Sequence, residues 1–227
     1  MFWFILSQSK TIGYLLLALV VTSCTNMSSL QTAKTLKKDQ GRFLIGGEMY
    51  HGSKSINGKR DSVWRNSKGQ MGYVDIGYRR GIAKDLDIGV KLIVFSLLFA
   101  DVKYQIIKEN EFVLSAGFGA GTSLPLSIRQ VEGPKTSRDT VWKKMHVYEV
   151  TFPLYISYDI NRYFSLYTSP KYIFHTVEGN YVMHMNLVGI TGGVKLGKKI
   201  GLFLESTYVT GLGSDFGALN VSGAFYF

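Results

Sequence analysis

From residue 41 to the C-terminus, hydrophobic and polar residues alternate along most of the chain. In the first stretch one parity is mainly apolar and the other mainly polar: Phe43, Ile45 and Met49 alternate with Arg42, Gly46 and Glu48. A period of two is typical of a β-strand with one apolar face. The pattern recurs in ten stretches, which begin near Arg42, Val74, Leu86, Val102, Phe112, Tyr148, Phe164, Val188, Leu202 and Leu219. Strands of roughly ten residues are long enough to cross a bilayer when tilted.

The polar parity decides which face points outward. It holds six acidic and five basic residues: Glu48, Asp75, Arg79, Asp87, Lys91, Asp101, Lys103, Glu149, Lys171, Lys195 and Glu205. Mixed signs suit a packed lumen in which charges pair, because an isolated buried charge is costly. The apolar parity carries almost no charge; Arg80 is the exception and lies at a strand end, where its side chain can snorkel. We therefore predict that Ile88, Leu114 and Phe152 face lipid, whereas a soluble barrel would turn them inward.

The connections alternate in length, with short turns at 83–85, 108–110, 159–162 and 197–199 and long links at 52–70 and 123–144. Short periplasmic turns and long external loops are typical of bacterial barrels. Outward aromatic residues near strand ends are typical of interface girdles: Phe43, Tyr78, Tyr104, Tyr148, Tyr158, Phe174 and Tyr208. The predicted fold is all-β, a closed antiparallel up-and-down transmembrane β-barrel of about ten strands. The segment 92–100 is poorly patterned, and a different pairing there would give eight strands.

The N-terminal segment is predicted to be removed before folding. Lys10 precedes an apolar run over residues 12–21, and Val21-Thr22-Ser23-Cys24 follows. This arrangement resembles a lipoprotein signal peptide, which implies cleavage after residue 23 and acylation of Cys24. An ordinary signal peptide with an incidental cysteine, or an uncleaved anchor, are the alternatives. Residues 24–40 are then a polar linker that carries the lipid to the inner leaflet of the outer membrane.

Residues 41–227 resemble a small bacterial outer-membrane β-barrel. Leu219, Val221, Phe225 and the terminal Phe227 share one face of the last strand. The resemblance implies that the barrel-insertion machinery reads this strand, and that the protein resides in the outer membrane of a diderm bacterium. It identifies no subfamily.

Charge is concentrated in the long links. Of the formal net charge of +10, the segment 52–70 carries +4 and the segment 123–144 carries +3. Basic loops at the cell surface favour an anionic partner such as lipopolysaccharide phosphates or acidic glycans. The alternative is that these loops are simply solvated.

One short repeat falls in these two links. Arg60-Asp61-Ser62-Val63-Trp64-Arg65 recurs as Arg138-Asp139-Thr140-Val141-Trp142-Lys143. Indole stacks on apolar faces of sugars and guanidinium pairs with phosphate, so the predicted anionic-ligand site comprises Arg60, Trp64, Arg65, Arg138, Trp142 and Lys143. The alternative is a structural role, in which the two copies pack on each other or their tryptophans anchor at the level of the lipid headgroups.

Catalytic and cofactor motifs do not emerge. Residues 192–199 resemble a phosphate-binding loop but lie in an alternating strand and end in Lys199 rather than Ser or Thr. No zinc-type histidine spacing exists, and three of the four histidines have outward parity. No cofactor, metal or nucleic-acid partner is predicted. Omptin proteases and lipid A-modifying enzymes are barrels of similar size; Asp139, His175 and Asp215 fall near the external rim, but no motif of either class matches.

The lumen is predicted to be crowded. A ten-stranded barrel is only slightly wider than the eight-stranded case that side chains fill. Five tyrosines join the eleven charges there: Tyr50, Tyr73, Tyr155, Tyr163 and Tyr167. The sequence thus favours a non-enzymatic outer-membrane barrel with a structural or surface-binding role. A narrow channel for small solutes is the alternative, and an enzyme active at the rim is a third.

Overall fold

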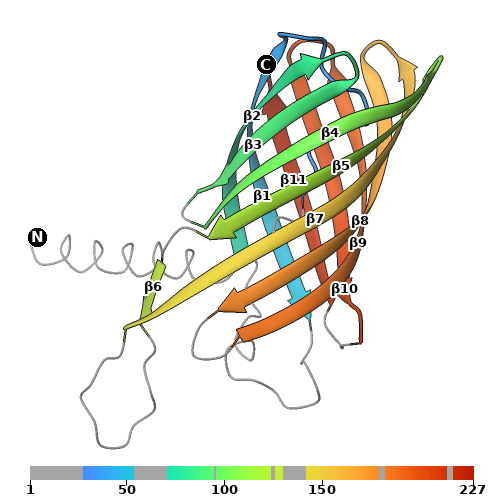
Figure 1. Ribbon diagram of the computed structural model, residues 1–227. Coiled ribbons are helices and arrows are strands. Elements are labelled where there is room, and N and C mark those ends of the chain that lie inside the picture. The colour runs from blue at the N-terminus through green and yellow to red at the C-terminus, as the bar shows by residue number, and fades with distance from the viewer. Residues whose placement is uncertain are drawn as a thin grey trace, which may run out of the picture.

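The computed structural model describes residues 28–53, 71–94, 96–123, 126–129, 142–178, 182–213 and 217–227. Ten of its strands form a closed antiparallel barrel, because β1 pairs with β11 and β5 pairs with β7 (Figure 1). The short strand β6 lies outside this ring and pairs with β7 alone. The bounds are β1 Gly41–Ser53, β2 Met71–Ala83, β3 Leu86–Ile93, β4 Leu97–Glu109, β5 Phe112–Ser123, β6 Leu126–Arg129, β7 Trp142–Asn161, β8 Phe164–Glu178, β9 Val182–Gly197, β10 Gly201–Gly211 and β11 Gly217–Tyr226.

The ten-stranded prediction is therefore confirmed, and the eight-stranded alternative is wrong. β3 and β4 are separate paired strands, joined around residues 94–96 where the sequence was ambiguous. Within the described ranges, no helix is long and apolar enough to cross a membrane.

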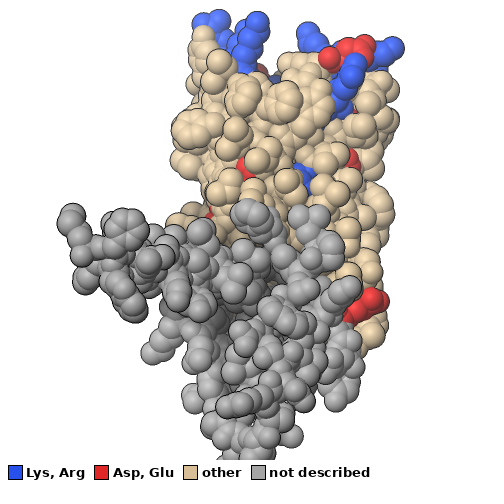
Figure 2. All heavy atoms as spheres, turned by 90° about the vertical axis from the view of Figure 1, so that its left-hand side faces the viewer, with Lys and Arg blue, Asp and Glu red and all other residues tan. Residues whose placement is uncertain are grey.

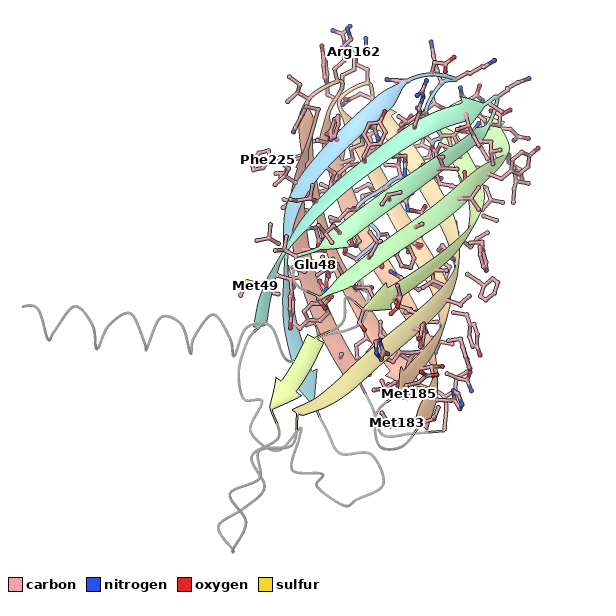
Figure 3. The ribbon with its side chains drawn as sticks, turned by 60° about the vertical axis from the view of Figure 1, so that its left-hand side comes forward. Glu48, Met49, Arg162, Met183, Met185 and Phe225 are labelled. Carbon is pink, nitrogen blue, oxygen red and sulfur yellow. The ribbon has the colours of Figure 1, made fainter. Side chains whose placement is uncertain are left out.

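The apolar parity of the strands faces outward. Ile88 and Phe152 are 42% and 50% exposed, whereas Asp75, Lys103 and Glu149 are at most 1% exposed. Figure 3 shows the same division on β1 and β11, where Glu48 points into the barrel and Met49 and Phe225 point away from it. Since side chains alternate across a strand, one orientation holds around the barrel.

The two ends of the barrel differ. Short turns join β2 to β3, β4 to β5, β7 to β8 and β9 to β10 at one end, which we call the turn end; we call the other the loop end (Figure 1). Asp85, Asn110 and Gly197 adopt positive φ in these turns. A Cβ at Gly197 would lie 2.3 Å from the carbonyl oxygen of Ile200, so this turn requires glycine.

The outer surface carries an apolar band. Figure 2 shows Lys, Arg, Asp and Glu gathered above this band at the turn end. The exposed charged residues of the short turns include Lys84, Lys108, Glu109, Glu111, Arg162, Lys198 and Lys199. All seven predicted girdle aromatics are exposed by 38–56%. At the turn end the ring of Phe43 lies 4.6 Å from that of Tyr78 and 6.0 Å from that of Phe227, between centroids.

Candidate functional site in the barrel lumen

Residues 28–37 lie inside the barrel, where we define them as the lumen segment. Ser28, Leu30, Thr32, Ala33 and Leu36 are at most 4% exposed. Their contacts come from strands all around the ring, so the segment is enclosed on every side. The sequence analysis treats this stretch as a linker outside the barrel. A strand has two different faces, but this segment has barrel wall all around it, and so its sequence shows no periodicity.

The lumen segment starts deep in the barrel and ends at the turn end. Followed back from β1, the chain is held at the turn end by hydrogen bonds of Asp39 and Gln40 with Gly81. The segment then contacts residues progressively farther from that end: Asp87 at Leu36, Asp159 at Lys34, Ser115 at Ala33, Tyr155 at Gln31 and Glu48 at Ser28. Glu48 is the eighth residue of the thirteen-residue β1, so Ser28 lies well within the barrel.

Carboxylates and lysines of the wall bind the main chain of the segment. Glu205 accepts hydrogen bonds from the amides of Ser29 and Leu30, at 2.6 and 2.7 Å. Lys103 donates to the carbonyl oxygens of Thr32 and Lys34, at 2.9 and 3.0 Å. Hydrogen bonds with a charged partner are roughly twice as strong as neutral ones. The wall thus fixes the backbone of the segment as well as its side chains.

A network of ion pairs surrounds the half of the segment nearer the turn end. The guanidinium of Arg79 pairs with both Asp87 and Asp101. The ammonium nitrogen of Lys103 lies 3.7 Å from a carboxylate oxygen of Asp87. Because each of these charges has an opposite charge beside it, the network offsets the cost of burying them.

A second cluster of charges lies deeper. The Lys91 ammonium is 3.3 Å from Glu48 and 3.7 Å from Asp75. Glu48 also accepts a hydrogen bond of 2.7 Å from Asn220, and Glu205 accepts one of 2.9 Å from Tyr167. Gly193 makes room for that tyrosine, since a Cβ there would lie 2.5 Å from the ring. All eleven residues of the predicted charge network occupy inward positions.

An apolar layer lies in the lumen toward the loop end, and of its members only Tyr50 and Tyr73 are predicted from the sequence to face inward. It consists of Tyr50, Tyr73, Ile93, Leu97, Phe99, Ile173, Leu187, Val209 and Ala218. The rings of Tyr50 and Tyr73 meet edge to face at 5.3 Å. Most of these residues break the rule that inward positions are polar. Apolar constrictions exclude water from pores, and this layer lies on the side of the lumen that the lumen segment leaves free.

A small cavity lies between the lumen segment and strands β2, β3, β4 and β7. Its volume is about 80 Å³, and Gln31, Arg79, Lys91, Asp101 and Tyr155 are among its lining residues. A water molecule needs at least roughly 10–15 Å³ measured in this way. This cavity therefore has room for only a few water molecules.

The predicted surface site falls largely outside the described residues. The structure does not describe Arg60, Trp64, Arg65 and Arg138 of this site. Cys24, the predicted lipidation site, also lies outside the described residues. Trp142 and Lys143 begin β7 and pair with Arg129 and Ile128 of β6. The second copy of the repeat thus ends at the start of a strand.

His175 and His184 lie on opposite faces of the barrel wall. His175 faces inward, 3.4 Å from Glu149. Exposed His184 hydrogen-bonds Thr176 at 3.0 Å and stacks on Phe174. No group of three or more metal-ligating side chains gathers among the residues the structure describes. The prediction that Tyr163 points into the lumen is wrong: it is 50% exposed in the β7–β8 turn, under the guanidinium of Arg162.

No family model matches the sequence, and no curated protein is similar to it. Three solved structures of similar architecture illustrate the low sequence identity of such matches. Neisserial surface protein A (NspA) is 8% identical, with 82% of this chain and 95% of that chain covered and a TM-score of 0.39. Ail of Yersinia pestis is 12% identical (84% and 99% covered, TM-score 0.35), and the outer membrane protease OmpT of Escherichia coli is 10% identical (86% and 98%, TM-score 0.43). The likeness is one of overall architecture alone, and no subfamily is identified.

Proposed function

We propose that this protein is an exported barrel of the outer membrane with a closed lumen and a non-enzymatic, surface-binding role. One observation carries the proposal: the barrel is apolar outside and ion-paired inside. Water surrounding a soluble barrel favours the reverse distribution, whereas a charge facing lipid at the midplane costs about 2–4 kcal/mol. The turn end then faces the periplasm and the loop end faces outward, as short turns and long loops do in bacterial barrels.

Membrane fractionation tests location and closure together. We expect the protein in the outer-membrane fraction, with faster gel mobility unheated than boiled, because a closed barrel resists unfolding by detergent. Recovery in the soluble fraction, with mobility independent of heating, would overturn the proposal.

The basic links are proposed to bind an anionic glycan or lipopolysaccharide. The charges of +4 and +3 in the two links support this, as does the pairing of tryptophan with basic residues in both copies of the repeat. We expect the double substitution Trp64→Ala and Trp142→Ala to weaken retention on immobilised lipopolysaccharide at least tenfold. Tyr163→Ala at the opposite end is the matched control and leaves retention unchanged. Equal retention of the double variant and the native protein argues for merely solvated loops.

Conductance separates this proposal from the alternative of a narrow channel. The lumen segment, the ion pairs and the apolar layer all obstruct the lumen, so the full chain in a planar bilayer is expected to show no steps of porin size. Small, regular steps carried by inorganic ions would favour the channel, for which the cavity beside Lys91 is the one supporting observation.

We also propose that Cys24 is acylated, but with its lipid in the other leaflet from the one predicted from the sequence. Traced back toward Cys24, the lumen segment moves away from the turn end, which is opposite to the path of a linker to the inner leaflet. We therefore propose that a lipid on Cys24 is inserted in the outer leaflet, at the loop end. Radiolabelled palmitate is expected in the native protein and absent from Cys24→Ser. An epitope inserted after residue 25 is then accessible to antibody on intact cells; detection only after permeabilisation supports the inner leaflet.

A further inference from the structure

The lumen binds a polypeptide mainly through groups that every polypeptide has. Besides the contacts of Glu205 and Lys103, Asp87 accepts a hydrogen bond of 3.0 Å from the Leu36 amide, and Ser115 donates to the Ala33 carbonyl oxygen. Main-chain groups of eight residues are therefore held by side chains of the wall: Ser28, Ser29, Leu30, Thr32, Ala33, Lys34, Thr35 and Leu36. Such contacts fix the path of the backbone, which is left-handed at Leu30 (φ 46°). Fewer bonds come from side chains of the segment, among them those that Ser28 donates to Glu48, Gln31 to Tyr155 and Lys34 to Asp159.

The space around the segment limits the size of side chains. Ala33 is fully buried against Val113 and Tyr155. Ser28 and Thr32 are also buried and small. A large side chain has no room at Ala33 or Thr32, because a packed interior tolerates added volume poorly, whereas Ser28 borders the small cavity.

One position along the segment is an apolar anchor. Leu30 packs into a pocket formed by Tyr167, Phe203, Ala224 and Tyr226. The Glu205 carboxylate, which binds the Leu30 amide, also contacts Tyr167 at the edge of this pocket. The wall thus combines a main-chain clamp with a socket for one aliphatic side chain.

We propose that the lumen is a binding site for a polypeptide segment with small side chains and one aliphatic anchor. The lumen segment is its resident occupant, and a second chain of the same chemistry binds in its place when the resident is displaced. Because the resident is tethered, its effective concentration is in the millimolar range, and it excludes other peptides from the native protein. This site is distinct from the anionic-ligand site proposed for the loops.

Displacement of the resident in the full chain tests the site. Ala33→Trp overfills the fully buried position and is expected to expel the segment. A fluorescein-labelled peptide with the sequence of residues 28–37 should then bind the variant in detergent at least tenfold more tightly than it binds the native protein, by fluorescence anisotropy. Micelles without protein give the background. A folded variant that binds no peptide overturns the proposal.

Two further peptides test what is recognised. A peptide in which the small residues are shuffled and Leu30 and Leu36 are kept should bind within about tenfold of the first. A peptide N-methylated at Ser29 and Leu30 keeps every side chain but cannot donate to Glu205, and it should bind at least tenfold more weakly. Equal binding of the methylated peptide, or complete loss with the shuffled one, contradicts main-chain recognition.

A second full-chain variant covers the case in which Ala33→Trp does not fold. Here glycine or alanine replaces residues 28, 29, 31, 32 and 35, and Leu30 and Leu36 are kept. If the wall binds the main chain, the thermal midpoint stays within a few degrees of the native value, whereas Glu205→Gln lowers it clearly. A midpoint that falls as far in the multiple variant as in Glu205→Gln overturns the proposal.

Discussion

Replacing Ile76 by arginine is expected to lower the free energy of unfolding in a bilayer by about 2–4 kcal/mol. Ile76 is 46% exposed on the outer face, near the middle of β2, and pairs with Ile45 and Leu92 on the neighbouring strands. If lipid surrounds this face, the guanidinium lies in hydrocarbon at the depth where its cost is greatest. Denaturant titration in phospholipid vesicles measures the effect.

The same strand supplies the control. Arg80 lies four residues along on the same outward face, at the turn end, where it pairs with Asp39 at 3.0 Å. Its replacement by leucine should change stability by no more than about 1 kcal/mol, because charge near the interface costs little. If Ile76→Arg is as mild as Arg80→Leu, the outer face contacts water and the membrane assignment is wrong.

The wall of the barrel can be predicted from sequence because each strand separates two very different environments. Apolar residues such as Phe152 occupy the outer side, and residues such as Glu149 occupy the ion-paired lumen. The choice between eight and ten strands needed the structure. The residues around Phe95 have no contrast between parities, since inward Ile93 and Leu97 belong to the apolar layer.

The contents of the lumen were predicted only in part. The eleven charges could be placed by parity, but their partners could not, because Arg79 and Asp101 come together only through the register of β2, β3 and β4. The lumen segment escaped prediction for another reason. Small polar residues such as Ser29 and Thr32 are as common in exposed linkers as in a segment held by its backbone, so composition alone does not distinguish the two.

Removing the guanidinium of Arg79 is expected to cost about 3 kcal/mol of stability. Arg79 side-chain nitrogens pair with Asp87 and Asp101, whose side chains are 0% and 10% exposed. In Arg79→Leu these two carboxylates stay in the lumen without their shared partner, and breaking one side of a buried pair costs roughly 3–5 kcal/mol. We expect the lower value, because Asp87 retains two partners in the variant. It still accepts the 3.0 Å hydrogen bond from the Leu36 amide and lies 3.7 Å from the Lys103 ammonium.

The conservative variant separates charge from geometry. Arg79→Lys restores the positive charge but offers no planar fork with which to pair with two carboxylates at once. Its loss of stability should therefore lie between those of the native protein and Arg79→Leu, measured by the same denaturant titration in vesicles. The double variant Arg79→Leu with Asp101→Leu should recover part of the loss, because one uncompensated carboxylate is removed with its partner. If Arg79→Leu alone is as stable as the native protein, water reaches these carboxylates, and the lumen is open at the turn end rather than filled.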